Sequence, residues 1–253
     1  TTLTPGNGYG NAYIDSLVWG CQWTNSNTYG QATVSAPVSI TYSFGEGTLG
    51  TNPLTPWTTD GIEAIRLAMD LFQSVCNVRF TESVASKANI IYYQLTESYF
   101  GNDSTTLGDF LVPDQSSAVC EGHFNAAHAM WANLMPGSSG FTTIIHELGH
   151  GMGLAHPHDG GGEEDTATTF PGVTSDTSTG TNGLNQGIWT TMSYIDGWNK
   201  LPPSPDYTYG NQASPMAFDV AALQAIYGVN TKYKTGNDAY RLPSSNQQGA
   251  YWM

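Results

Sequence analysis

"HELGHGMGLAHPH" (146–158) holds four of the six histidines of this 253-residue chain. Residues four positions apart lie on the same face of a helix, so His146 and His150 can direct two imidazoles at one point from successive turns. Glu147 lies about 100° round the helix from His146 and can reach the edge of that point without being forced to bind there. The spacing therefore predicts a helix that carries two paired histidines and an adjacent carboxylate.

A third histidine, His156, follows beyond the reach of that helix. The chain has to turn before it, and Gly153 is where it can turn, because glycine adopts positive φ without steric penalty. Three neutral imidazoles leave a tetrahedral zinc ion with one open position, which distinguishes catalytic from structural zinc sites. Water at such a position has its pKa lowered to about 7. We predict that His146, His150 and His156 bind one catalytic zinc ion. Glu147 is the predicted general base, which takes a proton from water and passes it to a leaving amine.

A methionine downstream completes the pattern. The histidine spacing with its glycine is the extended metzincin signature, which requires a methionine turn further along the chain. "TTMSYIDGW" (190–198) supplies Met192, followed by Tyr194. A phenol beside the site can donate a hydrogen bond to the negative charge that develops in a transition state. Tyr194 is therefore a candidate catalytic residue, and the alternative is an ordinary packed aromatic side chain.

Alternation of Ile40, Tyr42 and Phe44 predicts a strand at "SITYSFG" (39–45). The stretches "VRFTE" (78–82) and "ANIIYYQL" (88–95) are also read as strands, and "GDFLVP" (108–113) is a further candidate. A helix is expected after the first strand, because apolar side chains recur at steps of three and four residues from Ile62 to Cys76. Asp60 is its expected cap, with Glu63 as the capping-box partner. A second helix is expected near 141–153. This order of elements predicts an α+β fold with a twisted mixed sheet and a helix packed on it.

The motifs at 146–157 and 191–194 resemble the serralysin family of secreted bacterial zinc metalloproteases, in which a proline follows the third histidine, as Pro157 does here. Further stretches resemble the family across most of residues 11–230: "AYIDSLVWGCQW", "NVRFTE" followed by "ANIIYY", and "SPMAFDVAALQAIYGVN". The resemblance implies a metzincin protease domain. Its sheet would be mostly parallel, with two long helices, a C-terminal helix, and an active-site cleft between N- and C-terminal subdomains.

The same resemblance implies roles for individual residues. The three motif histidines would bind one zinc ion, Glu147 would be the general base, and Met192 would form a hydrophobic floor beneath the metal. Tyr194 matches a tyrosine that can ligate zinc and swing away to stabilise the oxyanion. Substrates would be proteins or peptides, and we expect a monomer.

The C-terminal helix marks an expected domain boundary. Ser214 is its expected cap, Pro215 fits its first turn, and Gly228 ends it in a left-handed conformation. We expect residues 1–229 to form the protease domain. Residues 230–253 are more polar, and we expect them to begin a calcium-binding repeat region of the kind that follows the protease domain in serralysins.

The composition argues against some partners. Seven Lys and Arg residues stand against 21 Asp and Glu residues, for a formal charge of −14. This balance offers no basic patch for nucleic acid or for an anionic membrane surface, and no apolar run approaches the length of a membrane span. "TTLTPGNGYG" (1–10) lacks the features of a signal peptide. We expect a secreted bacterial protein that is either already mature or exported through a C-terminal signal.

Other polar residues leave alternatives open. His123 and His128 lie in a stretch that can include an exposed edge strand and are expected to be surface residues, and His158 is expected to face solvent. "GGGEED" (160–165) is either a calcium site or a solvated acidic loop. Cys21, Cys76 and Cys120 allow one disulfide and one free thiol, or no disulfide; Cys76 is expected to be a buried core residue.

The leading function is therefore a secreted zinc endopeptidase. One rival is a non-catalytic binding module on the same scaffold, although the presence of Glu147 favours catalysis. Another is a toxin or processing enzyme with the same chemistry and narrow specificity. The sequence does not predict the cleavage specificity.

Overall fold

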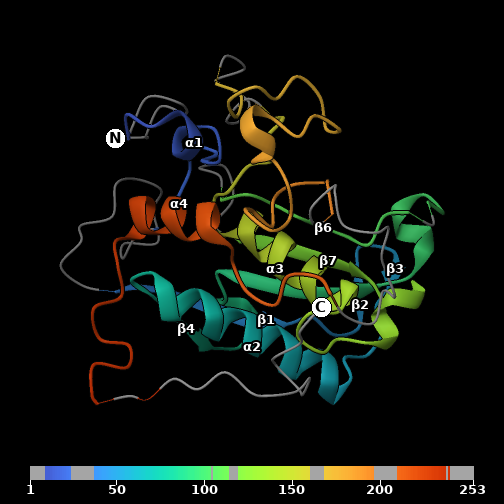
Figure 1. The fold of residues 1–253 in the computed structure, drawn as a ribbon. Helices are drawn as coiled ribbons and strands as arrows, with labels where there is room; N and C mark the ends of the chain where they lie inside the picture. Colours follow the sequence, from blue (N-terminus) through green and yellow to red (C-terminus); the bar gives the residue numbers. More distant parts are fainter. Residues whose placement is uncertain are drawn as a thin grey trace.

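A computed structural model describes residues 9–23, 37–103, 105–113, 119–159, 168–196, 210–237 and 239. Its centre is a five-stranded sheet with strand order β4-β1-β5-β7-β6 (Figure 1). The strands are β1 Val38–Phe44, β4 Val78–Glu82, β5 Ile90–Leu95, β6 Gly108–Phe110 and β7 Cys120–Asn125. Four of them are parallel, whereas β6 pairs antiparallel with β7 at one edge. A small antiparallel pair, β2 Thr48–Leu49 with β3 Asn52–Pro53, follows β1.

Two long helices cover one face of this sheet and contact each other (Figure 1). They are α2 Thr59–Val75 and α3 Ser139–Gly151. On α2 the buried residues recur at helical spacing, including Ile65, Met69 and Phe72, so one stripe of the helix faces the sheet. The mostly parallel sheet with two long helices confirms the predicted metzincin-type α+β fold.

A second group of elements packs against the C-terminal end of α3 and the turn after it. It contains α1 Ala12–Asp15, the segment 168–196 and α4 Ala217–Tyr227. Aromatic rings hold the group together, since Tyr13 of α1 contacts Phe170 and Phe218 at centroid distances of 5.1 and 5.4 Å. Short 3-10 helices complete the described elements: η1 Ala85–Lys87, η2 Glu97–Phe100, η3 Ala129–Ala132 and η4 Thr181–Gly183.

The helix ends differ from the sequence predictions. The cap of α2 is Thr58 rather than Asp60, because the Thr58 hydroxyl lies within reach of the Gly61 amide and accepts its hydrogen bond at 3.1 Å. The cap of α4 is Met216 rather than Ser214. The reason is that the buried carboxylate of Asp219 accepts a hydrogen bond from the Met216 amide at 2.8 Å, which fixes where the helix begins.

Other boundaries also need correction. Gly228 has the expected positive φ of 78°, but its ψ of 167° is extended rather than left-handed helical. The strand predicted at 108–113 extends only to Phe110. Cys76 is buried as expected, and no disulfide joins the three cysteines, all of which lie in described segments. None of the described helices combines the length and apolar character that crossing a membrane requires.

Candidate active site

Helix α3 and the turn after it position the histidine segment. The hydroxyl of Ser138 caps α3 by accepting from the Phe141 amide at 3.1 Å. The helix ends just before Gly153, whose φ is +88°, as the sequence predicts. A Cβ at this position would collide with the carbonyl oxygen of Cys21, so any other residue would be excluded by both backbone strain and space. The N-terminal segment holds the turn in place, because the backbone amide of Trp19 donates a hydrogen bond to the Gly153 carbonyl at 2.8 Å.

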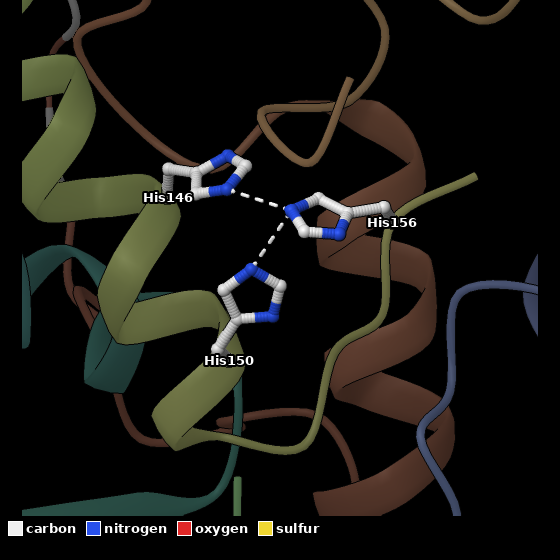
Figure 2. A group of neighbouring side chains, drawn as sticks. All are labelled: His146, His150 and His156. Atoms are coloured by element: carbon white, nitrogen blue, oxygen red, sulfur yellow. Dashed lines mark hydrogen bonds between the residues drawn. The ribbon is translucent and has the colours of Figure 1, made fainter. Parts of the chain in front are cut away.

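The three motif histidines meet at one point (Figure 2). The Nε2 atom of His156 lies 3.1 Å from Nε2 of His146 and 3.0 Å from Nε2 of His150. His146 and His150 come from successive turns of α3, and His156 returns from the chain beyond the turn. The predicted convergence of these side chains is thus present in the structure.

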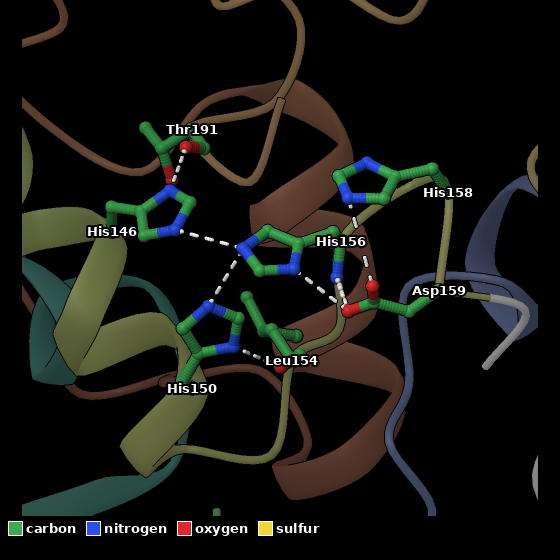
Figure 3. A network of polar contacts seen from close by, with 7 residues as sticks. All are labelled: His146, His150, Leu154, His156, His158, Asp159 and Thr191. Carbon is green, nitrogen blue, oxygen red and sulfur yellow. Dashed lines mark hydrogen bonds and ion pairs between the residues drawn. The ribbon is translucent and has the colours of Figure 1, made fainter. Parts of the chain in front are cut away.

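Each of these imidazoles is oriented through its other nitrogen (Figure 3). The Nδ1 atoms contact oxygen acceptors: the Thr191 carbonyl at 2.7 Å for His146, the Leu154 carbonyl at 2.9 Å for His150, and the Asp159 carboxylate at 2.7 Å for His156. Because these oxygens can only accept, each Nδ1 carries the proton. In its neutral form, each imidazole then presents an Nε2 lone pair toward the common point.

This donor set fits a zinc ion. Three lone pairs that face one another cannot hydrogen-bond to each other, whereas a cation at the common point would satisfy all three. Tetrahedral zinc with Zn–N distances of about 2.0–2.1 Å holds its nitrogen ligands roughly 3.3 Å apart, close to the observed spacing. Burial, reinforced by the neighbouring His156, lowers the pKa of His146 to about 4. Burial and the adjacent histidines lower the pKa of His150 as well, so both rings stay neutral, as metal ligands must be.

Glu147 lies beside this point on α3 and is 7 % exposed. Its side chain faces the edge strand β6, where a Cβ at Gly108 would lie 3.3 Å from the Glu147 Cγ atom. Burial raises the pKa of Glu147 to about 8, and the negative charge of Asp109 adds to the increase. A carboxyl group with a pKa close to the operating pH is suited both to take and to return a proton.

Met192 is fully buried, with its sulfur packed against Gly149 of the histidine motif. A side chain at position 149 would collide with that sulfur, which explains the glycine in the middle of the histidine motif. The two residues before Met192 are anchored by Asp219 of α4, whose carboxylate accepts hydrogen bonds from Thr190 Oγ1 at 2.6 Å and from the Thr191 amide at 2.8 Å. Because the Thr191 carbonyl accepts a hydrogen bond from Nδ1 of His146, Asp219 supports the site indirectly.

Tyr194 stands at the rim, with its residue 57 % exposed. Its ring centroid is 4.5 Å from that of His156 and 5.9 Å from that of His146. Partial burial, together with the charge of Glu147, raises the pKa of Tyr194, so the phenol keeps its proton and can donate it in a hydrogen bond.

The remaining histidines lie elsewhere or play other parts. His123 is not a surface residue of an edge strand: it is buried within β7, and β6 forms the edge. It pairs with Asp109 across these strands at 2.6 Å. His128 is half-buried and caps η3. His158 is half-buried rather than solvent-facing and stacks on His156 at a centroid distance of 5.0 Å.

Two supporting residues were not predicted from the sequence. The carboxylate of Asp159 accepts hydrogen bonds from Nδ1 and from the backbone amide of His156, at 2.7 and 3.1 Å. The signal available was a carboxylate three residues after a predicted ligand. For Asp219, the sequence showed only an acidic residue in the first turn of a helix, and acidic residues are common there in helices far from any functional site. The possible calcium loop at 160–165 lies outside the described residues.

Comparisons with known proteins agree with this geometry. Residues 36–162 match the sequence model of the matrixin family, Peptidase_M10. The chain is 27% identical to Serralysin C of Dickeya chrysanthemi, over 90% of this chain and 46% of that protein. It is 26% identical to Serralysin of Proteus mirabilis, over 87% of this chain and 46% of that protein. The chain therefore spans about half the length of the curated relatives it matches.

Proposed function

The chain belongs to the matrixin family, Peptidase_M10, and from that premise we propose that it is the catalytic domain of a serralysin-like, zinc-dependent endopeptidase. The observation that carries the proposal is the convergence of three Nε2 atoms, each imidazole being oriented through its Nδ1 atom, with Glu147 buried beside them. The proposed substrates are proteins or peptides, and the proposed working form is a monomer.

In the proposed mechanism, His146, His150 and His156 hold the zinc ion. When bound, zinc supplies a Lewis acid that polarises the scissile carbonyl and lowers the pKa of water to about 7. The carboxylate of Glu147 takes a proton from the attacking water and delivers it to the nitrogen of the leaving amine. The phenol of Tyr194 donates a hydrogen bond to the oxygen that becomes negatively charged. The buried Met192 supports the histidines from below.

Cleavage of a peptide library tests this function. The zinc-loaded chain should cut internal peptide bonds, a zinc chelator should stop the reaction, and added zinc should restore it. Hydrolysis that continues unchanged after complete removal of zinc would contradict the proposal.

The place of action and the domain limits belong to the same proposal. We infer from the similarity to serralysins that the protein is secreted from bacteria, with export through a C-terminal signal. We also propose a protease domain at 1–229 and the start of a calcium-binding region at 230–253. The boundary is supported by the bridge between Val229 and Cys76, which is the last strand-like pairing among the described residues.

Replacement of Tyr194 by phenylalanine should lower kcat by about 10- to 1000-fold, because one hydrogen bond to the developing negative charge is lost. Steady-state kinetics on one peptide measures the effect, and Tyr233→Phe, at a 50 % exposed tyrosine outside the cleft, is the matched control. An increase in KM with kcat unchanged would argue that Tyr194 only contributes to substrate binding.

Replacement of Asp159 by asparagine should weaken zinc binding by about 10- to 100-fold, because the carboxylate that orients His156 loses its charge. Competition with a coloured chelator measures the zinc affinity directly. Asp70→Asn, on the exposed face of α2, removes the same charge away from the site. Equal zinc affinities of the two variants would show that Asp159 does not support the ligand.

A further inference from the structure

Two cavities meet at the proposed catalytic centre and together form one cleft. Their volumes are about 490 and 470 Å³, and both are lined by Gly108, His146, Glu147 and Tyr194. The first cavity extends along residues 105–108, before and at the start of β6. The second extends along residues 108–112, toward the end of that strand. The two cavities therefore lie on opposite sides of the catalytic residues.

The orientation of a bound peptide follows from the edge strand. A substrate backbone can extend the sheet by pairing with β6, which is the edge next to the site. Antiparallel pairs outnumber parallel ones roughly two- to three-fold. An antiparallel peptide enters near residues 110–112 and leaves near residues 105–108. The residue that follows the scissile bond then lies in the first cavity.

The two cavities differ in chemistry. Hydroxyl groups dominate the first, with Ser139, Thr142 and Thr143 from α3 on one wall and Thr105 and Thr106 on the other. The second has an apolar part, formed by Trp19 together with residues 110–112. Two of these hydroxyls donate within the protein, Thr142 to the Gln212 carbonyl and Thr143 to the Ser139 carbonyl, and their remaining lone pairs can accept from a substrate. A side chain that donates hydrogen bonds therefore fits the first cavity better than an apolar one.

A carboxylate gives the first cavity its charge. Asp196 lies on its wall, and none of the described residues that line this cavity is Lys or Arg. Asp196 is exposed on this wall, so a cationic side chain that enters the cavity can reach its carboxylate. The chain as a whole has a formal charge of −14, which favours the approach of cationic peptides.

We propose that the enzyme prefers Lys or Arg immediately after the scissile bond, and that Asp196 recognises the positive charge. This inference rests on the proposed endopeptidase function and adds to it the class of substrate. Asp196 acts in specificity only, since it lies outside the histidine site and does not belong to the groups that transfer the proton.

A set of fluorogenic peptides tests the proposal on the zinc-loaded chain. The peptides differ only at the residue after the cleaved bond, which is Lys, Gln, Leu or Glu. We expect kcat/KM for Lys to exceed that for Gln by about 3- to 10-fold, the range for a partly exposed ion pair. Asp196→Asn should lower kcat/KM for Lys to the value for Gln in the same variant, and Asp196→Lys should favour Glu over Lys. Asp70→Asn is the control of equal charge change.

The possible failures can be told apart. A preference for Lys that survives in Asp196→Asn overturns the role of this residue. A preference that lies on the other side of the cleaved bond overturns the assignment of the first cavity. If the zinc-loaded chain cuts none of the peptides and no member of a random library, the proposed endopeptidase function fails, and this inference fails with it.

Discussion

Replacement of Glu147 by glutamine is expected to lower kcat for peptide hydrolysis by about 10²- to 10⁴-fold, the usual contribution of a positioned general base. Glutamine has nearly the same shape and can fill the buried position beside Gly108, but its amide cannot take a proton from water. The three histidines and their hydrogen-bond partners are left intact. The variant should therefore retain one zinc ion per chain while losing turnover.

Zinc content, unfolding temperature and kcat should be measured on the same preparation, so that loss of metal or of fold is separated from loss of chemistry. Glu63→Gln, on the exposed face of α2, is the matched control and should behave like the unmodified chain. A Glu147→Gln variant that retains near-normal kcat would rule out Glu147 as the base. A variant that loses its zinc would show that this carboxylate has a structural part at the site.

Local spacing in the sequence predicted the centre of the site well. The helical offset between His146 and His150 and the turn at Gly153 depend on backbone geometry within a few residues, and the structure contains both. Zinc binding and the roles of Glu147 and Tyr194 stay predictions. The residues that orient His146 were not predicted, because they reach the site through contacts between segments far apart in the sequence. The Thr191 carbonyl reaches His146 only because Asp219, on another helix, fixes the chain before Met192.

The sheet was predicted for similar reasons. Alternating side chains mark β1 as a strand, and short runs rich in β-branched and aromatic residues mark β4 and β5. The order of strands is a long-range property, so the sequence did not reveal that β7 is interior and β6 is the edge. His123 was accordingly misplaced: it is polar, and its burial is offset by contacts with Asp109 across the strands and with Glu121. The cap of α2 was misassigned because both Thr58 and Asp60 suit a helix start. The cap of α4 was misassigned because Met216 is not a usual cap residue and takes this position through its amide bond to Asp219.

Replacement of His150 by alanine is expected to abolish zinc retention and, with it, peptide hydrolysis. His150 supplies one of three nitrogen ligands, and its ring is already held in place by the Leu154 carbonyl. The two histidines that remain are one ligand short of the three protein ligands that a catalytic zinc site uses. Because a bound ion stabilises only the folded chain, added zinc should raise the unfolding temperature of the unmodified protein and leave that of the variant unchanged.

His158→Ala is the informative control for this prediction. His158 lies in the same segment, and together with His156 and Asp159 it forms a second group whose donor atoms lie close enough to hold a cation. Its ring, however, stacks on His156 instead of converging with His146 and His150. Elemental analysis should therefore find one zinc ion per chain in His158→Ala and none in His150→Ala. The reverse result would move the metal to the second group, and Glu147 would then lie on the wrong side of His156 to serve as its base.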